Sequence, residues 1–532
     1  MKNLIDLLPE HLKDGIKPAE ERLLEAVQKG DPADFRRGEE EIDKPEKADK
    51  WGNERIIRSE ILYWLCTSPD AIQNIHTKGI QIWGAKITGF IDFEGASIPH
   101  ILRIMNCFIE EEIILMDAKT KTINLFKSLL KSFTADRINI EGTLVLKKVI
   151  AKGVIRLLGA NINGDLNCNG ASFENAEGDS FRGDGLTTKG SVFLDNVTSK
   201  GAILLPGAKI NGNLGCTGAS FESVEGYSFI GDRLSTKDSV VFNNITSKGV
   251  IRLLGANING DLDCTGASFE DAGKYVLITE RAKIGGVFFL NKLKKANGRF
   301  NFSYMNVGQF VDDENSWPNQ DNLILTGFEY KGFGGGNTPT EADKRIQWIR
   351  LQDKKYFSTQ PYEQLAKVYR QIGHESDARE VMIAKQEDLR KYGKLSRKAK
   401  FWNWFLGETI GHGYKPLKAV GIIIVFLIFG IFIFSWANNY SVMQPSKERV
   451  YMSKDFQEKR SIPPEYPQFN PIMYSMDVFV PFLDLHQEDY WLPDASKPYG
   501  FWFRIYFWLH ILLGWVFSTL TAASLTGLIR KE

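Results

Sequence analysis

The residues best suited to do chemistry lie near the C-terminus, within an apolar stretch. Small and hydroxyl-bearing side chains follow helical spacing there, at Gly514, Ser518, Thr521 and Leu525. Such a face either packs closely against another helix, or lines a water-filled pore in an oligomer. Two polar residues, Arg504 and His510, are costly in lipid, so we expect them to face protein, water or headgroups.

A group of carboxylates precedes this face along the chain. Residues 471–491 are largely apolar, are interrupted by Pro481, and carry Asp477, Asp484, Glu488 and Asp489. This pattern predicts either a re-entrant element, whose acids would form a cation-favouring ring in an oligomer, or an amphipathic segment at the membrane surface.

Motifs for catalysis are missing from the sequence. The seven histidines are scattered singly, and no nucleophile elbow, phosphate-binding glycine loop or metal-ligand cluster occurs. Asp165 and Asp261 share a position in the repeats described below, but Asn213 interrupts the series where an acid–base pair would be needed. We therefore expect no catalytic residues, no cofactor and no metal, and predict that the protein is not an enzyme.

Two uncharged stretches predict membrane-spanning helices. Residues 419–436 carry no charge over 18 positions, and residues 505–529 form a second apolar run interrupted only by His510. Either run, as a helix rising 1.5 Å per residue, is long enough to cross most or all of a hydrocarbon core about 30 Å thick. The lipid bilayer is thus the first expected partner.

Lysine and arginine positions predict the orientation of these spans. Basic residues are dense between 390 and 418, Arg530 and Lys531 close the second span, and the intervening segment is richer in acids. The N-terminal sequence lacks the apolar core of a signal peptide. We expect both termini to be cytoplasmic, at the inner membrane of a bacterium. A net charge of +1 over 532 residues argues against nucleic acid as a partner.

An internal repeat gives the strongest signal in the chain. The sequence GVIRLLGANINGDLNCNGASFE, which begins at Gly153, recurs with few changes from Gly201 and from Gly249, an offset of 48 each time. Within each unit glycine recurs at a step of 11, and the intervening residues alternate as in short strands. This pattern predicts a parallel β-helix with two coils of about 20 to 24 residues per unit.

The repeat also fixes expectations for two residue types. The step of 11 marks turns, so at a position such as Gly212 we expect a positive φ that disfavours a β-branched side chain. Cys168, Cys216 and Cys264 recur at the offset of the repeat, so we place them two coils apart, about 10 Å, too far to form disulfides.

These glycine-strand repeats resemble those of pentapeptide-repeat and related bacterial β-helix proteins, although the step here is 11 and not five. Three further stretches resemble a family of bacterial membrane proteins that join a β-helix to a C-terminal membrane hairpin: AEERLLEAVQKGDPADFR from Ala19, WGNERIIRSEILYWL from Trp51, and GHGYKPLKA from Gly411. Members are sometimes labelled membrane-associated oxidoreductases, but this chain has no dinucleotide fingerprint and no CxxC pair to support redox chemistry. The order of span, re-entrant segment and span is similar to two-transmembrane ion channels, without their glycine-rich selectivity filter.

The predicted fold is mainly β, a parallel β-helix with flanking helices and a two-helix transmembrane hairpin. Its expected parts are a helical cap (1–75), the cytoplasmic β-helix (76–336), a tetratricopeptide-like helical hairpin (337–400), an interfacial segment (401–418), the first span (419–436), an exported loop (437–504) and the second span (505–529). The cap helices are expected at 19–27 and 55–65, where apolar residues follow helical spacing.

Two functions remain open. In the first, the protein is a homo-oligomer whose membrane helices form an ion-conducting or membrane-permeabilising pore, gated by a ligand or cytoplasmic protein on the β-helix. In the second, it is a membrane-tethered scaffold or partner-binding module without transport activity. Oligomeric state discriminates between them.

Overall fold

The computed structural model describes residues 3–270 and 274–528, so Arg530 and Lys531 lie outside the described residues. The chain divides into two compact units, Met1–Ala378 and Arg379–Glu532, and each is described by itself. The first unit is a parallel β-solenoid capped by helices, and the second is mainly helical.

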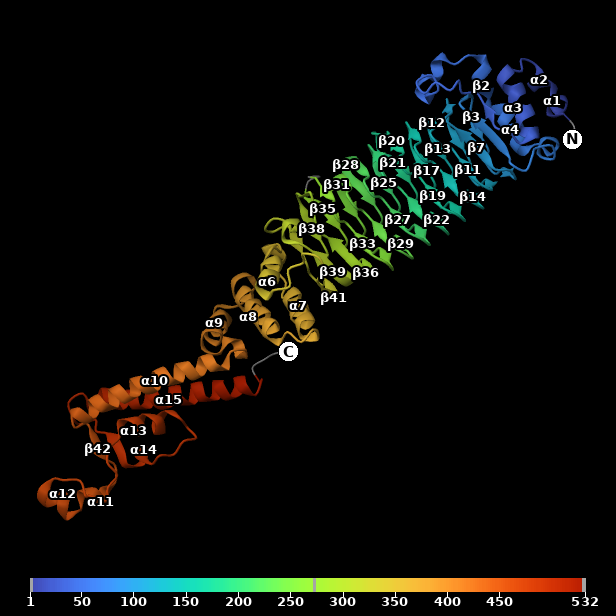
Figure 1. Ribbon diagram of the computed structural model, residues 1–532. Coiled ribbons are helices and arrows are strands. Elements are labelled where there is room, and N and C mark those ends of the chain that lie inside the picture. Colours follow the sequence, from blue (N-terminus) through green and yellow to red (C-terminus); the bar gives the residue numbers. More distant parts are fainter. Residues whose placement is uncertain (1–2, 271–273, 529–532) are drawn as a thin grey trace. The chain divides into compact units, whose positions relative to one another are not determined.

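Many coils of the solenoid contain four short strands, and in others two of these join into one longer strand, as in β28 (Ser220–Ile230). A representative coil is formed by β14 (Asn139–Ile140), β15 (Leu144–Val145), β16 (Ile150–Ala151) and β17 (Ile155–Arg156). The first two belong to one large sheet and the last two to the other, and all pair in parallel with the equivalent strands of the next coil. Figure 1 shows these strands stacked from blue to yellow along the chain. The predicted β-helix is confirmed, and the step of 11 is about half a coil.

Between Asn139 and Lys283, coils of two lengths alternate along the solenoid. Asn161 pairs with Asn139 in the coil before it and with Thr187 in the coil after it, and the second step along the chain is the longer one. One short and one long coil together make the repeat. The extra residues lie at one corner, because Phe173 pairs with Ala151 at the short step, whereas Phe181 pairs with Ile155 at the long step. The longer coil exceeds the predicted range, since this corner protrudes from the stack.

Glycines of the repeat serve two different purposes. Gly207 and Gly218 have positive φ values, 67° and 69°, at the third position of tight turns. The expectation of a positive φ at Gly212 is wrong. A Cβ there would lie 2.4 Å from the Ser191 hydroxyl and 3.1 Å from its backbone nitrogen, in the neighbouring coil. Gly212 therefore permits close stacking of coils, and not an unusual backbone conformation.

Aliphatic and aromatic side chains fill the interior of the coils. Phe221, Phe229 and Phe242 are fully buried and their rings contact one another in series. The five cysteines are all free and buried, which confirms that Cys168, Cys216 and Cys264 form no disulfides. Burial raises the pKa of the Cys66 and Cys107 thiols to about 12, so these side chains are unreactive apolar groups.

Helices and loops close the N-terminal end of the solenoid. They are α1 (Leu4–Leu7), α2 (Glu10–Lys13), α3 (Pro18–Lys29), α4 (Ser59–Thr67) and α5 (Pro69–Ile72). The expected helix at 19–27 lies within α3, but the one at 55–65 begins only at Ser59. Residues before it form β2 (Ile56–Arg58), which pairs with β4 (Lys86–Thr88) and so starts a ladder of the solenoid. The apolar residues at 56 and 57 therefore belong to strand pairing, which overrides their helical spacing.

A second group of helices follows the last coil. It comprises α6 (Ala342–Arg350), α7 (Gln360–Gln371) and the start of α8 (Glu375–Tyr392). Trp348 of α6 packs against Phe310 and Phe328 of the solenoid core, and the buried Arg345 guanidinium binds the Asp312 carboxylate at 2.5 Å. These contacts cover the open edge of the final coil, which would otherwise expose unpaired backbone groups.

Candidate functional site

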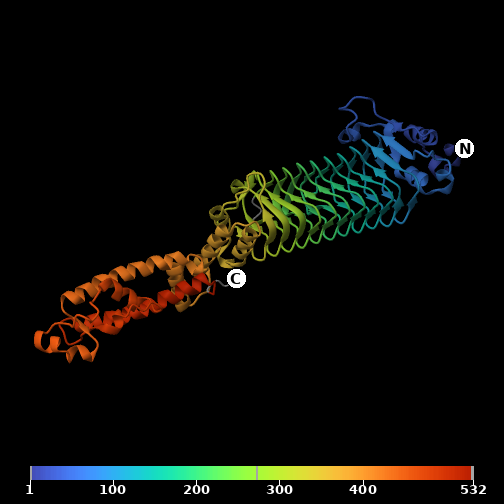
Figure 2. The same cartoon turned by 60° about the horizontal axis from the view of Figure 1, so that its bottom comes forward.

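Two long apolar helices dominate the second unit. They are α10 (Pro416–Asn439) and α15 (Gly500–Leu525), which lie side by side in Figures 1 and 2. Both are long and apolar enough to cross a membrane, at about 36 and 39 Å from a rise of 1.5 Å per residue. Large apolar side chains point away from the pair, including Val425, Phe432, Leu512 and Trp515, each more than half exposed. Such an apolar exterior is typical of helices in contact with lipid.

A third helix, α13 (Pro471–Phe479), packs against both long helices. Two glycines permit its close approach. A Cβ on Gly514 of α15 would lie 1.8 Å from the Phe479 carbonyl oxygen, and a Cβ on Gly430 of α10 would lie 2.4 Å from the Ser475 hydroxyl. Segment 471–491 thus contains a short helix that packs on both long helices.

A buried chain of polar groups joins the three helices. His510 of α15 is fully buried, with Nε2 3.2 Å from the Ser475 hydroxyl of α13 and Nδ1 3.2 Å from the Tyr506 hydroxyl one turn earlier. Ser475 donates its proton to the carbonyl of Leu427 in α10, at 3.0 Å. Because the serine proton is used there, the serine oxygen accepts from Nε2–H and Nδ1 accepts from Tyr506.

These hydrogen bonds satisfy both ring nitrogens of a neutral His510 imidazole. The rings of Phe434 and Phe479 lie 5.5 and 4.8 Å from that of His510, so the histidine is enclosed by aromatic side chains. The nearby Tyr474 hydroxyl is buried and has no hydrogen-bond partner in the part of the chain that the structure describes. The network therefore ties α13 to both long helices and leaves one hydroxyl unsatisfied.

The small-residue face is divided between different surroundings. Gly514 is buried against α13, Ser518 and Thr521 are half-buried, and Leu525 is 66% exposed. The Thr521 hydroxyl donates to the Phe517 carbonyl of its own helix at 2.7 Å. The buried stripe of α15 instead continues through Phe517 and Ser524, so the face turns away from the packed side after Gly514.

The four acids also lie in different surroundings. Asp477 is buried and accepts backbone N–H groups of Leu485 and Glu488, at 2.6 and 2.8 Å, so it holds the chain around α14 (Gln487–Tyr490). Asp484, Glu488 and Asp489 are exposed, and the first and last of these lie 2.9 and 3.7 Å from the His486 ring nitrogen. Asp484 also accepts the backbone N–H of His486 at 3.0 Å, so Asp477 is the buried member of the four and Asp484 an exposed one that holds a local turn.

The remaining residues singled out from the sequence lie at the ends of the long helices. Arg504 is in the second turn of α15 and is half-buried. The segment 401–418 includes most of α9 (Arg397–Ile410), on which Phe401, Trp402 and Trp404 are exposed. Exposed aromatic rings next to lysines suit the headgroup region of a bilayer. Among residues 3–270 and 274–528, no three His, Cys, Asp or Glu side chains are grouped so as to hold a metal ion.

Comparisons with protein-family models, with curated proteins and with solved structures give no match. Function is therefore inferred from geometry alone. The fold and the C-terminal helices define a parallel β-solenoid joined to a pair of apolar helices that enclose a short third helix.

Proposed function

We propose that the protein is a membrane-tethered scaffold. In this proposal α10 and α15 cross the bacterial inner membrane, both termini are cytoplasmic, and the solenoid offers a binding surface to a cytoplasmic protein or ligand. The observation that supports it best is the docking of α13 on Gly430 and Gly514. Gly430 and Gly514, the positions where the long helices allow the closest approach, are covered by α13 of the same chain. The hairpin therefore needs no second copy of the protein to cover these glycines.

The polar groups of the second unit also favour an anchor over a pore, because their hydrogen bonds are made within the same chain. His510, Ser475 and Tyr506 bond to one another and not toward a water-filled path. The Thr521 hydroxyl is bonded to its own helix, and Asp477 is used by backbone N–H groups. A pore would require polar groups that remain available to water and ions.

Reconstitution into vesicles tests the proposal. We expect no ion flux from the purified protein, and a particle mass of one chain plus detergent. Replacing Ser518 and Thr521 together by leucine should leave insertion and particle size unchanged, because leucine is well tolerated in a membrane helix. In cells the protein should resist extraction by high salt and be released by detergent.

A different set of results would support the pore. Flux from the unmodified protein that the double leucine variant abolishes, with a stable ring of chains in both proteins, would establish the pore and refute the scaffold. Dispersal of a ring by the same variant would show that these hydroxyl positions pack between chains.

A further inference from the structure

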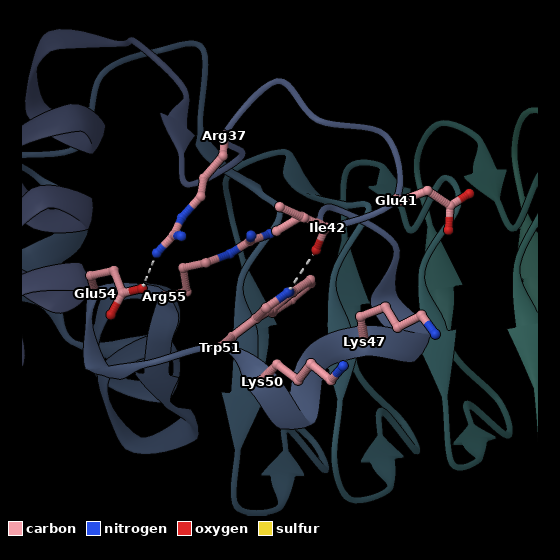
Figure 3. A pocket seen from close by; sticks show the side chains of 8 residues that line it. All are labelled: Arg37, Glu41, Ile42, Lys47, Lys50, Trp51, Glu54 and Arg55. Carbon is pink, nitrogen blue, oxygen red and sulfur yellow. Dashed lines mark hydrogen bonds and ion pairs between the residues drawn. The ribbon is translucent and has the colours of Figure 1, made fainter.

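A pocket in the N-terminal cap has the composition of an anion site. Its volume is about 170 Å³, far more than one water needs, and it lies between the loop at 37–42 and the helical turn at 45–50 (Figure 3). Four cations line it, Arg37, Lys47, Lys50 and Arg55, together with two carboxylates, Glu41 and Glu54. Ile42 and Trp51 complete the lining.

Arg55 is the central residue of this pocket. Its side chain is 2% exposed and lies over the Trp51 ring, 3.7 Å from the ring centroid. Nε donates to the Gly84 carbonyl at 2.8 Å and Nη1 donates to Asp43 at 2.9 Å. Nη2 is buried and has no hydrogen-bond partner among the described residues. A buried guanidinium N–H without a partner is costly, so an acceptor that reached Nη2 would stabilise this part of the cap.

The Asp43 carboxylate compensates only part of the Arg55 charge. It also accepts the backbone N–H groups of Arg37 and Gly38, at 3.0 and 2.9 Å. Burial lowers the pKa of Arg55, with Asp43 acting in the opposite direction. Burial thus makes the charged guanidinium less favourable than it is in water, and a further negative charge beside it would stabilise the charged form.

The carboxylates at the rim are already engaged. Glu54 binds the Arg37 guanidinium at 3.0 Å, and Glu41 binds Lys44, which is outside the pocket. Lys47 and Lys50 are exposed and extend from the same helical turn beside the pocket, as Figure 3 shows. Two mobile ammonium groups next to a fixed guanidinium are a common arrangement for binding a phosphate group.

We propose that this pocket binds a phosphate group, which free phosphate, a small soluble ester or a lipid headgroup could supply. Arg55 supplies a fixed positive charge and Arg37 an exposed guanidinium at the rim, while Lys47 and Lys50 close over the outer oxygens. The site lies in the cap and does not depend on whether the apolar helices conduct ions. The scaffold would then carry a small-molecule site in addition to its protein-binding surface.

Calorimetric titration of the full chain in detergent tests this proposal. The probes are inorganic phosphate, glycerol 3-phosphate, short-chain phosphatidic acid and, as a monoanionic carboxylate, acetate. We expect phosphate-bearing probes to bind at least tenfold more tightly than acetate. Tighter binding of phosphatidic acid than of glycerol 3-phosphate would identify a lipid headgroup as the source, and equal binding a soluble ester.

Variants separate the pocket from general charge effects. Lys47→Gln with Lys50→Gln should weaken phosphate binding at least tenfold, while Lys119→Gln with Lys209→Gln, on exposed strand positions of the solenoid, should change it less than twofold. Arg55→Lys keeps the charge but loses the planar fork, and should weaken binding to a similar extent if its circular dichroism is unchanged. The proposal is overturned if no phosphate-bearing probe binds more tightly than acetate, or if both double variants lose affinity equally.

Discussion

Replacing Gly514 by alanine perturbs the docking of α13 at its tightest point. The new Cβ would lie 1.8 Å from the Phe479 carbonyl oxygen and 2.7 Å from its carbon. Ordinary contact begins near 3.4 Å, so α13 must move away by more than 1 Å. Because the obstacle is backbone and not a side-chain tip, no rotamer change relieves it.

The size of the effect follows from these distances. Overpacking of this kind costs about 1–3 kcal/mol, and a cost of about 2 kcal/mol raises the population of undocked α13 about 30-fold. For Gly430→Ala the nearest atoms are side-chain atoms of Ser475 and His510, so it should cost about 1 kcal/mol through a weakened hydrogen bond. Gly421→Ala, on the same helix, meets nothing within 4 Å and is the matched control.

Maleimide labelling measures this undocking directly. A Val478→Cys background places a thiol on the buried face of α13, at a side chain that is 4% exposed. The five native cysteines are buried, which keeps background labelling low. We expect the labelling rate to rise about 30-fold with Gly514→Ala, about fivefold with Gly430→Ala, and not at all with Gly421→Ala.

Equal labelling rates in all three variants would refute the reasoning, since the docking of α13 would then not depend on the two glycines. A rise with Gly421→Ala as large as that with Gly514→Ala would show that the substitutions disturb the helices generally, and not this contact.

Two further predictions concern the first unit. Gly207→Ala should destabilise the solenoid by about 1–2 kcal/mol because of the positive φ, and Gly207→Asn by less because asparagine tolerates that conformation. At Gly212 the order should be reversed, with asparagine worse than alanine, because the neighbouring coil leaves no space for a larger side chain. Denaturant unfolding of the four variants measures both orders, and the same order at both sites would contradict the two roles. Burial raises the pKa of Glu20, but the hydrogen bonds from Arg58 outweigh this effect, so that the pKa lies below its ordinary value. Ionised Glu20 therefore stabilises the cap at neutral pH, and this contribution is lost as pH falls below about 4 toward the folded-state pKa. The tryptophan fluorescence of the cap should report this acid transition, and Glu20→Gln should remove it; an identical transition in Glu20→Gln would assign it to another group.

The solenoid could be predicted because its information is local and repeated. Alternation of apolar residues identifies strands, and the constant offset identifies the unit without any knowledge of long-range contacts. The structural role of each glycine could not be predicted from the repeat alone. Gly185 has a positive φ, but the equivalent positions in the repeats before and after it are Arg137 and Arg233, which adopt the same conformation. Glycine is thus one of several solutions at these turns.

The site in the two long apolar helices was only partly predictable. The apolar runs, His510 and a short element between the spans follow from composition. The contact of His510 with Ser475 joins two residues far apart in sequence, and no periodicity indicates it. Gly430 lies within an uninterrupted apolar run, where a glycine is the usual signal of close helix approach, and α13 packs against it in the structure. Within one chain the small-residue face is buried at Gly514 and exposed at Leu525, because an ideal helical spacing does not show where packing ends.

Alternation of short and long coils restricts how the solenoid can change length. Copying one whole repeat unit inserts a short and a long coil, so every ladder keeps its partner and the protruding corners stay in line. Copying a single coil would place two like coils together and break that alignment. The near-identity of the units beginning at Gly153 and Gly249 is what recent duplication of whole pairs would leave. Duplication of one whole unit would therefore lengthen the solenoid by about 10 Å, which is the increment by which such a protein could adjust its reach.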